Sequence, residues 1–130
     1  IVKPERKIIC IDGDGALIMH MGSLSAVGKL KLNNLNHILI NNQVHESVGG
    51  QATSAENIDF STLVKSQGYK NAYFADNNEK LILNIGEFFH RAGPSFLEIL
   101  VKPGYRFNLG RPTIKPIDNK KSFMTFVQGN

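Results

Sequence analysis

Four short apolar runs stand out along the chain. They cover residues Lys7–Asp12, His37–Asn41, Asn71–Ala75 and Ser95–Val101. Each run is a continuous apolar stretch rather than an alternation of apolar and polar residues, which is typical of parallel strands that are covered on both faces. The pattern therefore predicts four buried strands.

The segments between these runs repeat their apolar residues every three or four positions, which is the spacing of a helix. The first predicted helix carries Leu17, Met21, Leu24 and Val27 on one face. The second carries Phe60, Leu63 and Val64 and follows a candidate N-cap, Asp59.

The third predicted helix has the most regular pattern. Its apolar face runs from Leu81 to Phe89, and Gly93-Pro94 ends it. A last short helix is predicted to use Asp118 or Asn119 as its cap. This helix is expected to bury three side chains, those of Phe123, Met124 and Val127.

The order of strands and helices predicts the fold class. Alternating strands and helices with right-handed crossovers give an α/β fold, a three-layer open parallel sheet with helices on both faces. The 130 residues suit one domain. Ligands of such sheets bind beyond the carboxyl ends of the strands. The unpatterned stretch from Asn41 to Asn57, which follows the second strand, is therefore a candidate functional loop.

Composition and charge narrow the class of partner. No apolar run approaches the roughly 20 residues of a membrane helix, and no signal peptide is visible, so we expect a cytoplasmic protein without a membrane partner. The net charge is +4, but the basic residues are spread along the chain. This spread argues against a nucleic-acid partner and is compatible with a small anionic ligand. The single cysteine, Cys10, excludes an internal disulfide, and we expect a buried thiol there.

The chemistry-bearing motif follows the first strand, which ends in Asp12-Gly13-Asp14-Gly15. The glycines let the backbone turn tightly and approach a ligand, and a helix N-terminus offers N–H groups to a phosphate. Asp14 would repel that phosphate unless a cation lay between them. Mg²⁺ is suitable, since it binds one or two protein oxygens together with phosphate oxygens and water. Asn41 or Asn42, at the end of the next strand, would provide a second ligand.

These two strand ends are separated by 25 residues between Gly15 and Asn41. The arrangement resembles the thiamine-diphosphate signature of the decarboxylase and synthase superfamily. Four longer segments resemble the phosphonopyruvate decarboxylases within it, over essentially the whole chain: GDGALIMHMGSL at Gly13–Leu24, NNQVHESVGGQAT at Asn41–Thr53, GRPTIKP at Gly110–Pro116 and NKKSFMTF at Asn119–Phe126. The sulfopyruvate decarboxylases share the first segment, whereas the loop of the second is more similar to the phosphonate enzymes.

The resemblance implies a binding site for thiamine diphosphate and Mg²⁺. The side chains of Asp14 and Asn42 and the carbonyl of Val44 would hold the metal, with Asn41 as the alternative to Asn42. Backbone N–H groups of Gly15 and Ala16 would meet the diphosphate. The implied cofactor-binding residues are Gly13, Asp14, Gly15, Ala16, Asn42 and Val44.

The resemblance also implies that residues 1–130 form the diphosphate- and Mg-binding domain, as a C-terminal fragment of a longer enzyme that is incomplete at its N-terminus. The pyrimidine-binding domain, which carries the glutamate that activates the cofactor, is not in this sequence. It is expected on the same or a neighbouring chain of a homo-oligomer. The fragment alone is therefore expected to be inactive.

The implied reaction is the decarboxylation of phosphonopyruvate to phosphonoacetaldehyde. His45 and Glu46 follow the metal-binding residues and are candidates for proton transfer. Three basic residues, Arg106, Arg111 and Lys115, are candidates for contact with the phosphonate by their charge alone.

Other functions remain open at this point. Within the superfamily, the substrate would be sulfopyruvate, pyruvate or another 2-oxo acid, or the enzyme an acetolactate-type synthase. Asp12–Leu17 also resembles the nucleophile motif of haloacid-dehalogenase-type phosphatases, but those enzymes need Thr or Ser where Asn41 and Asn42 stand. A non-catalytic receiver-like module would need an aspartate at that same strand end.

Overall fold

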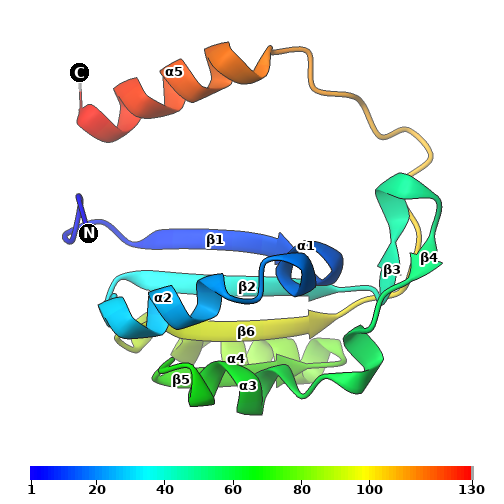
Figure 1. Cartoon of the computed structure of the whole chain (residues 1–130), viewed down its shortest axis with the longest axis horizontal. Helices are drawn as coiled ribbons and strands as arrows, with labels where there is room; N and C mark the ends of the chain where they lie inside the picture. The colour runs from blue at the N-terminus through cyan, green and yellow to red at the C-terminus, as the bar shows by residue number, and fades with distance from the viewer. Residues whose placement is uncertain (130) are drawn as a thin grey trace.

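The computed structural model describes residues 1–129 and shows a parallel sheet of four strands with helices on both faces (Figure 1). The strands are β1 (Ile8–Gly13), β2 (Leu35–Asn41), β5 (Asn71–Ala75) and β6 (Ser95–Leu100), in the spatial order β1-β2-β6-β5. All three strand pairs are parallel. The predicted α/β class and all four predicted strands are confirmed.

The helices follow the predicted pattern with one break. They are α1 (Asp14–Met19), α2 (Ser23–Leu30), α3 (Phe60–Ser66), α4 (Asn78–His90) and α5 (Pro116–Gln128). The first predicted helix is two helices, α1 and α2, which are separated at residues 20–22. The predicted cap of α3 is confirmed, since Asp59 Oδ1 accepts a hydrogen bond from the Thr62 N–H at 3.0 Å.

Two hydrophobic clusters hold the layers together. One lies between the sheet and helices α1, α2 and α3, and its buried residues are Leu17, Leu24, Leu39, Ala55, Phe60, Val64, Tyr69 and Phe96. The other lies between the opposite face and α4 and contains Ile38, Phe88 and Leu97. Strands β1, β2 and β6 are adjacent in the sheet and run parallel. Their carboxyl ends are therefore neighbours at one edge of the sheet.

The loop predicted from Asn41 to Asn57 contains short elements of its own. Strands β3 (Val44–His45) and β4 (Gln51–Ala52) form an antiparallel hairpin, and 3₁₀ turns cover Glu46–Val48 and Ala55–Asn57. Figure 1 shows this hairpin standing at the carboxyl edge of the sheet, beside the start of α1.

The expectation that every strand is covered on both faces is wrong for β1. Ile9 is 50% exposed and Ile11 is 66% exposed. The reason is the position of β1, which pairs only with β2 at one side of the sheet, while α4 packs on residues of the other three strands. Cys10, expected to be buried, is also exposed, on the opposite face of β1 beside Asp12 and His37.

The last predicted helix is present as α5, but its predicted cap and most of its predicted burial are wrong. Helix α5 begins at Pro116, with Lys115 rather than Asp118 or Asn119 as its N-cap. Phe123 is 63% and Met124 45% exposed, because α5 lies beyond β1, outside the two hydrophobic clusters (Figure 1). Its third apolar residue, Val127, is half-buried.

Helix α5 is held to the N-terminal segment by Arg6. The guanidinium of Arg6 lies 5.0 Å from the centre of the Phe126 ring and donates a long hydrogen bond, 3.4 Å, to the Phe126 carbonyl. Among residues 1–129, no helix is both long enough and apolar enough to span a membrane.

Candidate functional site

Asp14 begins α1 at the carboxyl end of β1, and its side chain is 2% exposed. Its Oδ2 accepts a hydrogen bond of 2.5 Å from the Thr53 hydroxyl. None of the ion pairs between residues in the range 1–129 includes Asp14. A buried carboxylate with one neutral donor is costly to desolvate. Its environment therefore favours a cation at this position.

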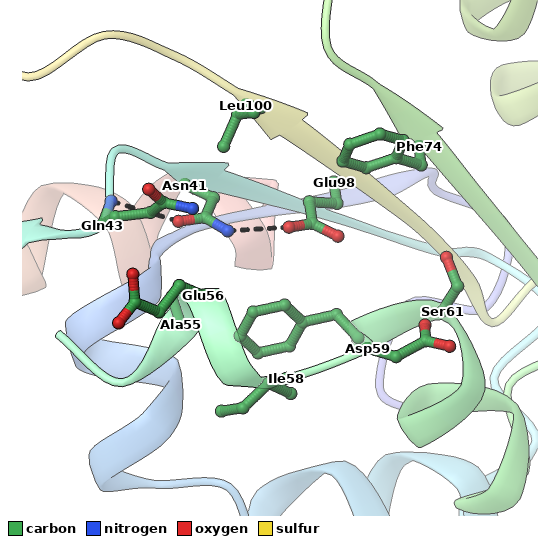
Figure 2. Close-up of a pocket in the computed structure, with 11 residues that line it drawn as sticks. Asn41, Gln43, Ala55, Glu56, Ile58, Asp59, Ser61, Phe74, Glu98 and Leu100 are labelled. Carbon is green, nitrogen blue, oxygen red and sulfur yellow. Dashed lines mark hydrogen bonds between the residues drawn. The ribbon is translucent and has the colours of Figure 1, made fainter.

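Asn41 ends β2 and uses both parts of its amide inside the protein (Figure 2). The amide nitrogen donates to Glu98 Oε1 at 2.7 Å, and the amide oxygen accepts from the Gln43 N–H at 3.2 Å. The residue is 2% exposed. Asn41 therefore ties the end of β2 to β6 through its amide nitrogen, and it is more deeply buried than its half-buried neighbour Asn42.

Asn42 is half-buried and forms a turn with Val44. Its Oδ1 accepts a hydrogen bond from the Val44 N–H at 3.2 Å, an Asx-type turn that Gln43 completes with a φ of 61°. Its amide nitrogen donates to Glu46 Oε2 at 3.2 Å. The turn brings the amide oxygen of Asn42 and the backbone of Val44 together, beside the strand end that carries Asp14.

His45 lies against the first turn of α1. A Cβ atom placed on Gly15 would lie 2.5 Å from Nδ1 of His45, closer than real contacts allow. Glycine at position 15 therefore lets the β3–β4 hairpin approach α1. The Thr53 N–H donates to the Gln43 carbonyl at 2.9 Å and closes the base of the hairpin, while the Thr53 hydroxyl bonds to Asp14 at the start of α1. Gly15 and His45, predicted separately, are in direct contact.

The two remaining cofactor candidates border open space. A Cβ on Gly13 would meet no atom within 4 Å, and Ala16 is exposed on α1. The backbone on this side of the α1 start is thus accessible to a ligand.

Glu46 bridges two segments that are distant in sequence. Its Oε2 accepts one hydrogen bond from Asn42 and another from the Gly104 N–H at 3.0 Å. Of the predicted phosphonate contacts, Arg106 and Arg111 line a cavity together with Glu46. The third, Lys115, does not line this cavity and caps α5 instead.

Glu98 adds negative charge beneath the site. It is 7% exposed on β6 and lines a second cavity, of about 360 Å³, together with Asn41, Asp59 and Phe74 (Figure 2). Burial raises the pKa of Glu98, the Asn41 hydrogen bond opposes the rise, and the charges of Asp59 and Asp14 add to it. Glu98 is therefore a buried acid close to the strand ends, held by the Asn41 amide.

The Glu98→Gln variant is expected to be more stable than the natural protein at neutral pH. Because the pKa of Glu98 is raised in the folded state, stability falls as the pH rises from about 4.5 through the raised pKa. Glutamine carries no charge and keeps an oxygen for the Asn41 amide. Denaturant unfolding at pH 4 and pH 7 measures the effect. The variant's free energy of unfolding should exceed that of the natural protein by more at pH 7 than at pH 4. Equal differences at both pH values would contradict the burial argument.

A second cluster of polar groups lies between β1 and β2. His37 is buried, with Nδ1 3.0 Å from the Tyr69 hydroxyl and Nε2 3.3 Å from Asp12 Oδ2. Burial lowers the pKa of His37, and Asp12 opposes the change. Cys10 lies close by, within 4.8 Å of the Asp12 and His37 ligand atoms. Hydrogen bonds already engage both ring nitrogens, so His37 has a structural role in linking β1 and β2 to Tyr69.

Two residues of the site were not predicted. In the sequence, Thr53 only ends the Asn41–Thr53 motif, and Glu98 only lies within an apolar strand. A single carboxylate within the run Ser95–Leu100 was the available signal for Glu98, since a buried strand rarely carries an acid without a partner. No pattern in the sequence indicates that Thr53 contacts Asp14.

Comparison with protein families identifies the family of this chain. Residues 1–99 match the model of "Thiamine pyrophosphate enzyme, C-terminal TPP binding domain". In fold, the chain is similar to a solved protein from Mycobacterium smegmatis that is assigned as thiamin diphosphate-dependent. The TM-score is 0.62 at 18% identity, over 76% of this chain and 18% of that one.

Curated relatives include two kinds of decarboxylase. The phosphonopyruvate decarboxylase of Streptomyces viridochromogenes is 31% identical over 94% of this chain and 31% of its own length. The sulfopyruvate decarboxylase subunit beta of Methanothermobacter thermautotrophicus is 33% identical over 77% of this chain and 51% of its own length. The chain thus spans about a third of the phosphonopyruvate decarboxylases that it matches.

Proposed function

Because the chain belongs to the family of thiamine pyrophosphate enzyme C-terminal TPP-binding domains, we propose that it forms the diphosphate- and metal-binding half of a 2-oxo-acid decarboxylase site. The observation that carries this proposal is the buried Asp14 carboxylate, which has no cationic partner among the described residues and lies at the strand ends beside the Asn42–Val44 turn. The family match favours neither the phosphatase nor the receiver-like interpretation.

In this proposal Mg²⁺ is held by the Asp14 carboxylate, the Asn42 amide oxygen and the Val44 carbonyl. Carboxylate, amide and carbonyl oxygens are the hard ligands that this ion prefers, so the donor set fits. The backbone N–H groups of Gly15 and Ala16 bind the diphosphate, next to the open space at Gly13. When bound, thiamine diphosphate supplies the electron sink for loss of carbon dioxide.

His45 and Glu46 divide two tasks on the hairpin. His45 lies against Gly15, at the start of α1, and is the better placed of the two for moving a proton near the cofactor. Glu46 already accepts two hydrogen bonds at one oxygen, so it mainly positions Asn42 and the segment around Gly104.

The proposed substrate is phosphonopyruvate, with phosphonoacetaldehyde as product. Two phosphonopyruvate decarboxylases that are 30–31% identical over 94% of the chain support this choice. Sulfopyruvate is the second candidate, because sulfopyruvate decarboxylase subunits match as well. Both acids carry a tetrahedral anionic group on the carbon next to the keto group.

The proposed partner is a pyrimidine-binding domain on the same or a neighbouring chain, within a homo-oligomer. Three of the relatives are described as beta subunits of sulfopyruvate decarboxylase, which supports a site completed by another subunit or domain. Residues 1–130 would then be the diphosphate- and Mg-binding domain of the whole enzyme.

Carbon dioxide release by the complete protein tests the proposed function. Phosphonopyruvate, sulfopyruvate and pyruvate are supplied separately, each with and without Mg²⁺ and thiamine diphosphate. Preferential, cofactor-dependent turnover of phosphonopyruvate is expected. Preferential turnover of sulfopyruvate would change the proposed substrate to sulfopyruvate and leave the cofactor assignment unchanged. Turnover that does not depend on the cofactor would contradict the proposal.

Thr53→Val is expected to weaken Mg²⁺ binding about ten-fold, the lower end of the range for loss of a group that orients a metal ligand. Valine keeps the shape but removes the hydroxyl that donates to Asp14. The Mg²⁺ concentration at half-maximal cofactor binding measures the effect. Thr62→Val is the matched control, because its hydroxyl donates to the exposed Asp59. Equal Mg²⁺ affinity in the two variants would refute the role of Thr53.

A further inference from the structure

A cavity of about 390 Å³ lies between the β3–β4 hairpin and the segment that follows β6. Its lining residues are Glu46, Ser47, Tyr105, Arg106, Phe107, Leu109 and Arg111. A volume of this size is within the range of small-molecule sites. We refer to it below as the arginine cavity.

The arginine cavity adjoins the residues proposed to bind the metal. Glu46, on its wall, accepts a hydrogen bond from Asn42, and the same oxygen accepts from the Gly104 N–H. Gly104 has a φ of +126°, a conformation that favours glycine, and two residues later the chain reaches Arg106. The bridge through Glu46 therefore places the segment that carries the arginines directly beside the Asn42–Val44 turn.

The lining of the arginine cavity is positively charged. Arg106 and Arg111 are its two cationic residues, and Glu46 is its one acid. Neither arginine belongs to an ion pair with any residue in the described range 1–129. Ser47 adds a hydroxyl to the lining, and the exposed side chains of Phe107 and Leu109 add apolar surface at its border. Two guanidinium groups without acidic partners make the cavity suited to an anion.

A tetrahedral oxyanion matches these groups in geometry. Each guanidinium presents a planar fork of N–H donors that can engage two oxygens of a phosphonate or sulfonate at once. With such a group bound in the cavity, the keto carbon of a short 2-oxo acid would lie toward the neighbouring Asn42–Val44 turn.

We propose that Arg106 and Arg111 bind the phosphonate or sulfonate group of the substrate in the arginine cavity, and so select 2-oxo acids that carry a tetrahedral anion. This inference rests on the proposed function for the identity of the 2-oxo acid. It extends that function by naming the residues that determine substrate specificity, and it excludes Lys115 from the same task.

The kinetic test uses Arg106→Gln and Arg111→Gln in the complete protein. Each variant is expected to raise the KM for phosphonopyruvate by about ten- to a hundred-fold, as expected for lost hydrogen bonds to a charged group. The kcat/KM for pyruvate, which lacks the anionic group, should change less than about two-fold. Arg111→Lys keeps the charge without the fork of N–H donors. Its KM for phosphonopyruvate should lie between those of the natural protein and Arg111→Gln. Arg91→Gln, which breaks an exposed pair with Glu87 on α4, is the matched control.

A binding test separates this inference from the proposed function. Phosphonoacetate and sulfoacetate are titrated calorimetrically into the complete protein loaded with Mg²⁺ and thiamine diphosphate. If neither glutamine variant weakens their binding, and the KM for phosphonopyruvate is also unchanged, the inference is wrong even where turnover is normal. If no 2-oxo acid is turned over but both variants lose phosphonoacetate binding, the anion site stands and the decarboxylase proposal fails. Tighter binding of phosphonoacetate than of sulfoacetate identifies a phosphonate as the preferred group.

Discussion

Asp14→Asn is expected to lower the Mg²⁺-dependent binding of thiamine diphosphate by about a hundred-fold or more, and to abolish turnover with it. Asparagine has nearly the same shape, so the change removes the charge and little else. The natural carboxylate is buried and its only donor among the described residues is Thr53, which leaves it free to bind a cation. Calorimetric titration of thiamine diphosphate into the complete protein, at several Mg²⁺ concentrations, measures the loss.

Stability provides a second measurement for this variant. Without metal, Asp14→Asn should be at least as stable as the natural protein, because a buried charge has been removed. Its melting temperature should no longer rise with Mg²⁺ and cofactor, since only a bound ligand stabilises. Asp76→Asn is the matched control: Asp76 also follows a strand, β5, but pairs with Lys80 at 2.8 Å. Cofactor affinities of the two variants within two-fold of each other would overturn the metal assignment.

Gly28→Ala is expected to destabilise the domain by about 3 kcal/mol, near the upper end for overpacking. Gly28 lies in α2, where a Cβ atom would be 1.7 Å from the Gln67 carbonyl oxygen and 3.1 Å from the Gly68 Cα. These are backbone atoms at the end of α3, so no side-chain rotation relieves the clash. Helices α2 and α3 would have to separate, which would open the core beneath them.

The shift in denaturant midpoint of the domain measures the effect of Gly28→Ala. Gly86→Ala, in α4, is the matched control, because a Cβ there meets no atom within 4 Å. This control should be stabilised by up to about 1 kcal/mol through the higher helix propensity of alanine. A loss of less than about 1 kcal/mol for Gly28→Ala would show that α2 and α3 are not in close backbone contact.

The strands were predictable because strands inside a sheet are built from continuous apolar residues, which can be recognised in the sequence. Continuous apolar runs located β2, β5 and β6, and the cap of α3 was found because Asp59 precedes an apolar repeat. The same runs do not distinguish a central strand from an edge strand. The sequence of β1 reads like the others, although Ile9 and Ile11 are exposed. That difference depends on the strand order, which no local pattern encodes.

Helical spacing has a similar limit. Leu17, Met21 and Leu24 keep their spacing across the break between α1 and α2, so the pattern predicts one helix. Gly22, which precedes α2, was the only local sign of the break. For α5, the apolar residues Phe123 and Met124 imply burial, but the helix lies beyond β1 and leaves both side chains exposed.

The strand-end motifs predicted where the candidate site lies, because parallel strands present their carboxyl ends at one edge. They did not predict the partners of the site residues. Thr53 is 39 positions from Asp14, and Glu98 is 57 positions from Asn41. Contacts at such separations follow from the order of strands in space. The roles of Asp14, Asn42, Val44 and His45 stay predictions until a variant tests them.

The bridge through Glu46 has a thermodynamic consequence. Oε2 of Glu46 accepts hydrogen bonds from both Asn42 and Gly104. Ordering of the Asn42–Val44 turn and ordering of the segment that carries Arg106 are therefore coupled. Thermodynamic linkage makes this coupling reciprocal. If bound Mg²⁺ and cofactor raise the affinity for the anion by some factor, the bound anion raises the affinity for Mg²⁺ and cofactor by the same factor. The domain would therefore load its ligands cooperatively, and a single glutamate would set the strength of that cooperativity.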